Sequence, residues 1–207
     1  MKRIHIAWTA LALACAAFIA PTIALPLGPD SSMFYVSAQK ILHQGAIHYR
    51  DIVELKPPPI YYMYALALVF SESATSIRVL DILLQLMTCV GIVMLIRRVG
   101  GSNAWAATSA LIYAAMYGGL GYAYTMECES YVGLLVVGMA WMMLVSRTRT
   151  SFVIAGALAG AAALLKFPFG IVIGAIVMCE LAITRVTMRG AAANIALALA
   201  GFAAMIA

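Results

Sequence analysis

The sequence predicts an all-α membrane protein with about seven transmembrane helices and a long first outer loop that carries interfacial helices. Apolar residues make up 65% of the 207 residues, charged residues only 10%, and the mean hydropathy is +1.00. Such a composition excludes a water-soluble domain with a polar surface. Long apolar runs recur along the chain, and basic residues gather between them, as in the cytoplasmic loops of membrane proteins.

The apolar segments differ in length. A helix rises about 1.5 Å per residue and must cross about 30 Å of hydrocarbon, so residues 59–70 would reach only roughly 18 Å. We interpret this segment as a juxtamembrane or re-entrant piece and the other seven as transmembrane helices. The eight segments comprise residues 4–27, 59–70, 76–96, 104–124, 130–145, 151–165, 167–184 and 190–207.

The first segment shares features with a cleaved signal peptide, because Lys2 and Arg3 precede an apolar run that extends to about Leu27. The run is long enough to span a membrane and more apolar segments follow, which favours a first transmembrane helix with a cytoplasmic N-terminus. The basic residues at the span ends then fall on the cytoplasmic side. They are Lys2, Arg3, Arg97, Arg98, Arg147, Arg149, Arg185 and Arg189.

The same topology places most of the polar chemistry near the outer face. The prolines, nine of the ten tyrosines and six of the eight acids fall there, with Glu180 near the cytoplasm. The basic residues are accounted for by topology, so the net charge of +5 does not indicate a nucleic-acid partner. The working surface is therefore predicted to be external. The four scattered cysteines indicate neither a zinc site nor a disulfide framework.

The first outer loop, residues 28–76, is predicted to be a structured platform. The stretch SSMFYVSAQKILHQG indicates an interfacial helix that ends in a turn at Gly45. Its apolar face comprises Phe34, Ala38, Ile41 and Leu42, and its polar face Ser37, Lys40, His43 and Gln44. In DIVELKPPPIYYMY, the prolines exclude a helix interior and favour an extended Lys56.

We treat residues 1–207 as one transmembrane module. Its later helices contain Gly156-x-x-x-Gly160 and Gly170-x-x-x-Gly174, which allow close approach between helices.

Several charged residues could carry chemistry, each with a structural alternative. Asp30, at the membrane edge, could act as general base or as the N-cap of the interfacial helix. Glu127 and Glu129 lie two residues apart, so at most one should face a shared site. Lys166 could bind a phosphate or simply extend its ammonium to the interface. Arg78 and Asp81 most simply pair with each other, and the spacing of His43 and His48 argues against a histidine metal centre.

Taken in order, several motifs resemble the GT-C superfamily of integral-membrane glycosyltransferases of the family 39 type, which includes protein O-mannosyltransferases and the aminoarabinose transferases of lipid A. The resemblance covers roughly residues 1–185. The motifs are GPDSSMFYVSAQKILHQG, YRDIVELKPPPIYYMY, IRVLDILLQL, LIRRVGG, TMECESYVGLL and GALAGAAALLKFPFG.

The resemblance implies a role for each matching residue. Asp30 matches the catalytic base and Glu127 the acid that opens the second outer loop, while Glu54 and Lys56 match residues near the donor phosphate. Lys166 matches a phosphate-facing lysine. A divalent metal near the acids is left open. We also name as supporting residues Tyr35, Asp51, Tyr61 and Glu129.

Two departures from the family pattern stand out. Ser31 follows Asp30 where the mannosyltransferases often have a second acid. The chain also stops at Ala207 inside an apolar run, whereas family members usually continue through further spans, so we expect a truncated C-terminus.

The leading hypothesis is transfer of a sugar from a polyprenyl-phosphate donor to the hydroxyl of a lipid or protein acceptor. The reaction would take place at the outer face of a bacterial inner or plasma membrane, among membrane lipids and without nucleic acid. The alternatives are a transporter or flippase fragment, with Arg78, Asp81 and Lys166 along its pathway, and a non-catalytic assembly module. Because the charges gather at one face and no repeat is found, the transferase is favoured over the transporter.

Overall fold

The computed structural model confirms the all-α prediction in the residues it describes, which are 2–54, 56–169, 171, 174, 177–178 and 188–207. The chain forms two compact units, Met1–Tyr131 and Val132–Ala207. The helices of the first unit are α1 (Lys2–Ile19) with its 3₁₀ extension η1 (Ala20–Ala24), α2 (Pro29–Gln44), α3 (Pro59–Phe70), α4 (Ala74–Arg98), α5 (Asn103–Gly118) and the first turn of α6 (Cys128–Trp141).

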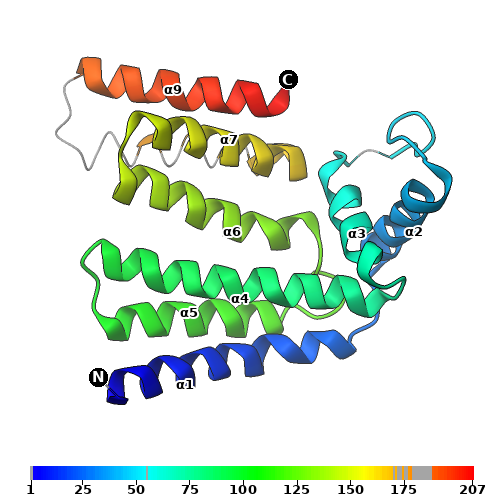
Figure 1. Ribbon diagram of the computed structural model, residues 1–207, viewed down its shortest axis with the longest axis horizontal. Helices are drawn as coiled ribbons and strands as arrows, with labels where there is room; N and C mark the ends of the chain where they lie inside the picture. The colour runs from blue at the N-terminus through cyan, green and yellow to red at the C-terminus, as the bar shows by residue number, and fades with distance from the viewer. Residues whose placement is uncertain (1, 55, 170, 172–173, 175–176, 179–187) are drawn as a thin grey trace. The chain divides into compact units, whose positions relative to one another are not determined.

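In the first unit, α1, α4 and α5 pack side by side, with α4 antiparallel to the other two (Figure 1). Helices α2 and α3 pack against each other at the end of this layer where α1 ends and α4 begins, and α3 also contacts α4. The segment between α1 and α4 therefore folds back onto one end of the three-helix layer.

Helices α1 and α5 approach closely because glycine and alanine lie where they meet. A Cβ atom built on Gly118 would lie 2.2 Å from the carbonyl oxygen of Phe18, and Ala110 and Ala114 are fully buried. Small residues let helix backbones approach in this way. The buried cluster beside them also includes Cys15, Ile19, Cys89 and Tyr117.

Helix α2 begins earlier than predicted. Its N-cap is Gly28, with Pro29 in the first turn, and the Asp30 side chain makes no capping bond, so the prediction of Asp30 as N-cap is wrong. Gly45, at φ 64°, ends the helix in the left-handed conformation, which confirms the predicted turn. Phe34 and Ala38 are buried as predicted, but Ser37 is buried with them rather than exposed.

Helix α3 has the predicted bounds and only twelve residues. The N–H groups of Tyr61 and Tyr62 donate to the carbonyl of Pro58 at its start. The rings of Tyr61 and Tyr64 meet the Phe34 ring edge to face, with centroids 5.3 and 5.5 Å apart. These aromatic contacts join α3 to α2.

Three helical stretches in the described part of the chain are long and apolar enough to cross a membrane: Ile6–Ala24, Ala74–Arg98 and Cys128–Ser146. They support an integral-membrane protein, while the count of seven spans stays a prediction. Most of the predicted segment 167–184, together with Glu180 and Arg185, lies outside the described residues.

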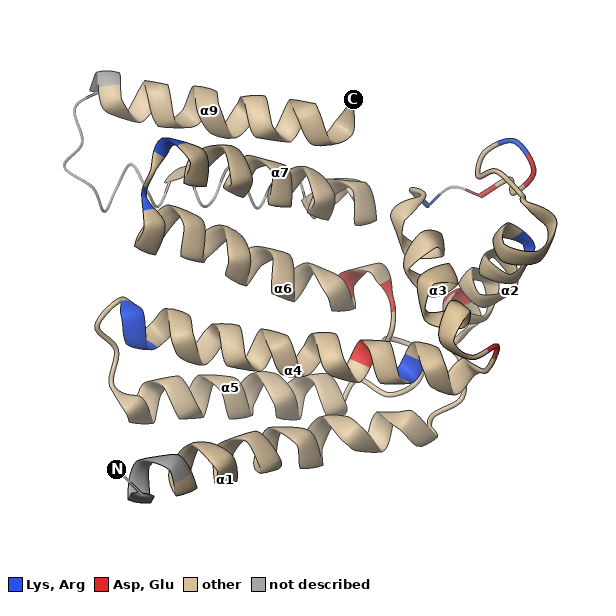
Figure 2. Cartoon of the chain, in the orientation of Figure 1, with Lys and Arg blue, Asp and Glu red and all other residues tan. Residues whose placement is uncertain are grey.

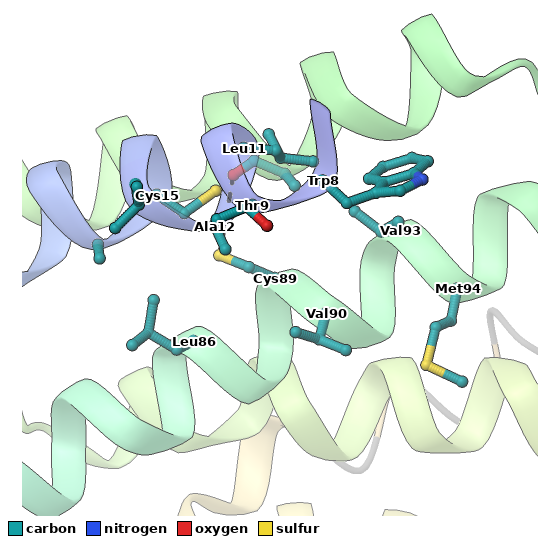
Figure 3. Close-up of a pocket in the computed structure, with 13 residues that line it drawn as sticks. Trp8, Thr9, Leu11, Ala12, Cys15, Leu86, Cys89, Val90, Val93 and Met94 are labelled. Carbon is teal, nitrogen blue, oxygen red and sulfur yellow. Dashed lines mark hydrogen bonds between the residues drawn. The ribbon is translucent and has the colours of Figure 1, made fainter. Parts of the chain in front are cut away.

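An apolar groove of about 540 Å³ lies between α1 and α4, in the half of these helices farthest from α2 and α3 (Figure 3). Trp8, Cys15, Cys89 and Val90 are among the residues that line it. At the end of the groove nearest the C-terminus of α4, the Arg97 guanidinium lies 5.1 Å from the centre of the Trp8 ring, a cation–π contact. This contact joins the two helices near the basic end of α4.

The second unit contains the rest of α6, the π-helical turn η2 (Met142–Ser146), α7 (Arg149–Leu165), η3 (Phe167–Phe169) and α9 (Met188–Ile206). Helices α7 and α9 pack closely, because a Cβ atom on Gly156 would lie 1.8 Å from the Ala198 carbonyl oxygen and one on Gly160 would lie 2.8 Å from Met205. The first predicted glycine pair is thus a packing motif. In the second pair, Gly170 lies outside the described residues.

We predict that Gly118→Ala lowers thermal stability in detergent, because its methyl group would collide with the Phe18 backbone, at a cost of about 1–3 kcal/mol. Gly119→Ala is the matched control, since its Cβ atom would lie 3.3 Å from the nearest backbone oxygen. Equal melting temperatures for the two variants would contradict the close α1–α5 packing.

Candidate functional site

Three charged side chains from distant segments of the first unit meet where α2 and α3 pack on the layer of α1, α4 and α5. Lys56, just before the three prolines, donates a hydrogen bond from Nζ to the carboxylate of Asp30 in the first turn of α2. The same Nζ lies 3.4 Å from Oε2 of Glu127, the residue before α6. One ammonium therefore bridges two carboxylates that lie 97 positions apart in the chain.

The three side chains differ in accessibility. The Asp30 side chain is 53% exposed, the Lys56 side chain 28% and the Glu127 side chain 9%. An incoming molecule could thus reach Asp30 and part of Lys56, whereas Glu127 lies behind them. Glu127 is therefore the shielded partner of the lysine and Asp30 the accessible one.

The environment affects the protonation of the two more buried groups. Burial raises the pKa of Glu127 above its ordinary value, and the negative charge of Asp30 adds to this, although Lys56 acts in the opposite direction. Burial alone would lower the pKa of Lys56, but its bond to Asp30 and the charge of Glu127 outweigh that effect and raise it. Lys56 is therefore a cation at neutral pH.

The start of α2 is docked onto the segment that precedes α6. The buried Ser31 hydroxyl donates to Oε1 of Glu127 at 3.2 Å. At Gly28, a Cβ atom would lie 2.8 Å from the Tyr122 carbonyl oxygen, so the close approach requires glycine. Ser31, which departs from the mannosyltransferase pattern, thus binds one of the site's own acids.

Two charged side chains of α4, Arg78 and Asp81, also hold the segment that precedes α6. They were predicted to pair with each other, but each binds other partners instead. Arg78 donates to the Thr125 hydroxyl at 2.7 Å and to the Pro26 carbonyl. Asp81 accepts from the Tyr117 hydroxyl at 2.7 and 2.8 Å, and also from Gln85. Each charge is therefore used to position the backbone around the site.

Met126 shows why the segment needs this support. Its φ of 66° lies in the left-handed region, which is unfavourable for a residue with a side chain. Its N–H donates to the Tyr117 hydroxyl at 3.2 Å, and its carbonyl accepts from Tyr64 at 2.9 Å. The strained conformation places the next residue, Glu127, against Lys56.

Phe34 contributes an aromatic surface that sequence reasoning did not assign to the site. The Lys56 Nζ lies 4.6 Å from the centre of the Phe34 ring, a cation–π contact. Phe34 lies four residues after Asp30 on α2, so the two side chains share a helical face. That spacing is the signal that could have found it.

The other predicted site residues have varied positions. Tyr35 donates to the Glu72 carbonyl at 2.8 Å, and Asp51 binds Arg50 and the Ile47 N–H. Tyr61 is fully buried behind Phe34.

The remaining predicted site residues are the acids Glu54 and Glu129 and the cation Lys166. Glu54 is half-buried. Burial raises the pKa of Tyr61, and the negative charge of Glu54 raises it further. Glu129 is exposed, whereas Glu127 is buried and contacts Lys56. Lys166 follows α7 in the second unit, so its part in the site stays a prediction. No group of three His, Cys, Asp or Glu among the described residues could hold a metal ion.

Apolar helices of membrane-spanning length, with a lysine and two carboxylates at one end, define an integral-membrane protein with a polar site at the edge of its helices. The profile of one family, described as dolichyl-phosphate-mannose-protein mannosyltransferase, matches residues 55–207, and the chain belongs to this family. This family is of the GT-C glycosyltransferase type and uses a lipid-phosphate sugar donor. The match includes Lys56, Glu127 and Lys166 and begins after Asp30.

Comparisons with curated proteins and with solved structures give no match.

We predict that Tyr117→Phe destabilises the protein more than Tyr113→Phe, as measured by thermal unfolding in detergent. The first change removes a hydroxyl that donates to Asp81 and accepts from Met126, so the buried Met126 N–H loses its partner, at about 1–3 kcal/mol, and Asp81 keeps only its bond from Gln85 among those described. Tyr113, one turn earlier on α5, donates instead to the Gln85 side chain. Equal effects would contradict the role of Tyr117.

Proposed function

We propose that the protein transfers a sugar from a polyprenyl-phosphate donor to an acceptor hydroxyl at the outer face of the membrane. The observation that carries the proposal is the position of Lys56 between the exposed Asp30 and the buried Glu127. Glycosyl transfer from a lipid phosphate needs a base for the acceptor and a cation for the leaving phosphate. The family supports the same general chemistry.

In this proposal, Lys56 binds the phosphate of the donor. A phosphate oxygen takes the place of the Asp30 carboxylate at Nζ, while Glu127, which is shielded from solvent, keeps its contact with the lysine. Asp30 then becomes available to the acceptor. The family resemblance adds Lys166 as a second cation for the phosphate and Glu54 as an acid that contacts the donor.

The chemical step follows from these roles. Asp30 removes the proton of the acceptor hydroxyl, and the oxygen attacks the anomeric carbon from the side opposite the phosphate. The bond between that carbon and the phosphate oxygen breaks, and the lipid phosphate leaves with its new charge beside Lys56. The proton ends on Asp30, and the sugar is transferred with inversion.

The outer location is supported by the distribution of charge in the first unit. Asp30 and Glu127 lie at the end formed by α2 and α3, whereas Arg97 and Arg98 end α4 at the opposite side of the layer (Figure 2). Cytoplasmic ends of transmembrane helices are rich in arginine. We infer that the arginine end is cytoplasmic, with seven spans in all, and that the site faces outward.

The proposal is tested by measuring transfer of labelled sugar from a polyprenyl-phosphate donor by the purified protein. Asp30→Asn should lower the rate by about 10²–10⁴-fold, as expected for loss of a general base. Lys56→Ala should raise the KM for the donor and lower kcat. The matched controls are Glu72→Gln and Lys40→Ala, in the same loop, which should retain activity.

Undiminished transfer by Asp30→Asn would rule out its role as base. If the wild-type protein transfers sugar from none of the donors tested, the result would count against a transferase and favour a non-catalytic assembly module.

We predict that transfer declines as the pH falls through the raised pKa of Glu127, because protonation removes one of the charges that hold Lys56. In Glu127→Gln, the acidic decline in kcat/KM should move to lower pH. Stability changes in the opposite direction, since a carboxyl with a raised pKa in the folded state binds its proton more tightly there and stabilises the fold as the pH falls. An unmoved acidic midpoint would contradict the assignment.

A further inference from the structure

The carbonyl oxygen of Lys56 lacks the usual local hydrogen-bond donors. Such an oxygen in a turn accepts from the N–H three residues further on, and here that residue is Pro59. Pro57, Pro58 and Pro59 all lack an N–H group. None of these three residues can therefore donate to the Lys56 carbonyl.

His48 provides a donor from the preceding loop. Its Nε2 lies 3.0 Å from the Lys56 carbonyl oxygen. Because a carbonyl oxygen can only accept, Nε2 carries the hydrogen of this bond. His48 is 6% exposed, and its buried Nδ1 has no partner among the residues described. The ring thus has one hydrogen bond, and it is directed at Lys56.

Aromatic rings hold the imidazole in place. Its centroid lies 4.2 Å from that of Tyr49 and 4.4 Å from that of Tyr61. Tyr49 has a φ of 67°, a left-handed conformation that marks a constrained loop. Tyr61 in turn contacts Phe34, whose ring lies beneath the Lys56 ammonium. One aromatic cluster therefore supports both the carbonyl and the Nζ of Lys56.

We propose that His48 is a positioning residue for Lys56. Its Nε2–H fixes the lysine backbone so that Nζ reaches Asp30 and Glu127 together. Without this bond, the segment would depend on contacts of the Lys56 ammonium, which the donor phosphate must also use. The consequence for donor binding rests on the proposed function, whereas the positioning itself does not.

Two variants separate hydrogen-bond donation from ring packing. His48→Gln places an amide nitrogen near the position of Nε2 and can still donate, while His48→Phe keeps a ring between Tyr49 and Tyr61 but cannot donate. The readout is the rate at which acetic anhydride acylates Lys56, followed by mass spectrometry in the purified protein. The exposed Lys40 on α2 is the internal reference.

We expect His48→Phe to raise the acylation of Lys56 relative to Lys40 by roughly 2- to 10-fold, the factor that one net hydrogen bond supplies. His48→Gln should match wild type. In the transfer assay, His48→Phe should raise the donor KM more than it lowers kcat, and His48→Gln should restore the wild-type KM. Equal acylation in wild type and His48→Phe, or an equal increase in both variants, would overturn the proposal.

The wild-type protein provides a test that needs no variant to fold. Nitrogen NMR of histidine-labelled protein should find a hydrogen on Nε2 of His48, and a ring that carries its hydrogen on Nδ1 alone would overturn the proposal. If wild type shows no sugar transfer, the proposed function fails, while the acylation and NMR results still decide the role of His48.

Discussion

The geometry of the site depends on one buried guanidinium, that of Arg78. It is 1% exposed and joins the Pro26 carbonyl, just after the first helix, to the Thr125 hydroxyl, just before Glu127. A buried charge is costly unless hydrogen bonds compensate it. Arginine suits this position because its planar group directs several N–H donors at separate acceptors. The segments that carry Asp30 and Glu127 are thereby joined through α4.

Asp81 complements this link from one turn further along α4. Through the Tyr117 hydroxyl it supports the Met126 N–H, so the two buried charges of α4 act on consecutive residues of the same segment. Charges that line a transport pathway would instead face a water-filled route. The contacts made by Arg78 and Asp81 are those of a scaffold for the Glu127 segment.

The features that depend on neighbouring residues were predictable from the sequence. The length of the apolar run determined helix α3, residues 59–70. Asp30 was misplaced as a cap because Pro29 occupies the first turn and moves the cap one residue before it. The meeting of Lys56 with Glu127 joins positions 71 residues apart, and no local periodicity encodes such a contact. Charge type and a common face could indicate the candidates, but only the packing of α2 and α3 brings these two together.

The bridge between one ammonium and two carboxylates leaves the cluster of Asp30, Lys56 and Glu127 with one excess negative charge when all three are ionised. A sugar linked to a lipid phosphate carries a single charge on its phosphodiester, whereas the lipid monophosphate left after transfer carries about −1.5 to −2 near neutral pH. In the proposed reaction, the acceptor proton ends on Asp30, so the cluster becomes neutral in the same step in which the phosphate gains its additional charge. Loss of that proton from Asp30 would restore the negative charge beside Lys56 and so favour release of the spent carrier lipid.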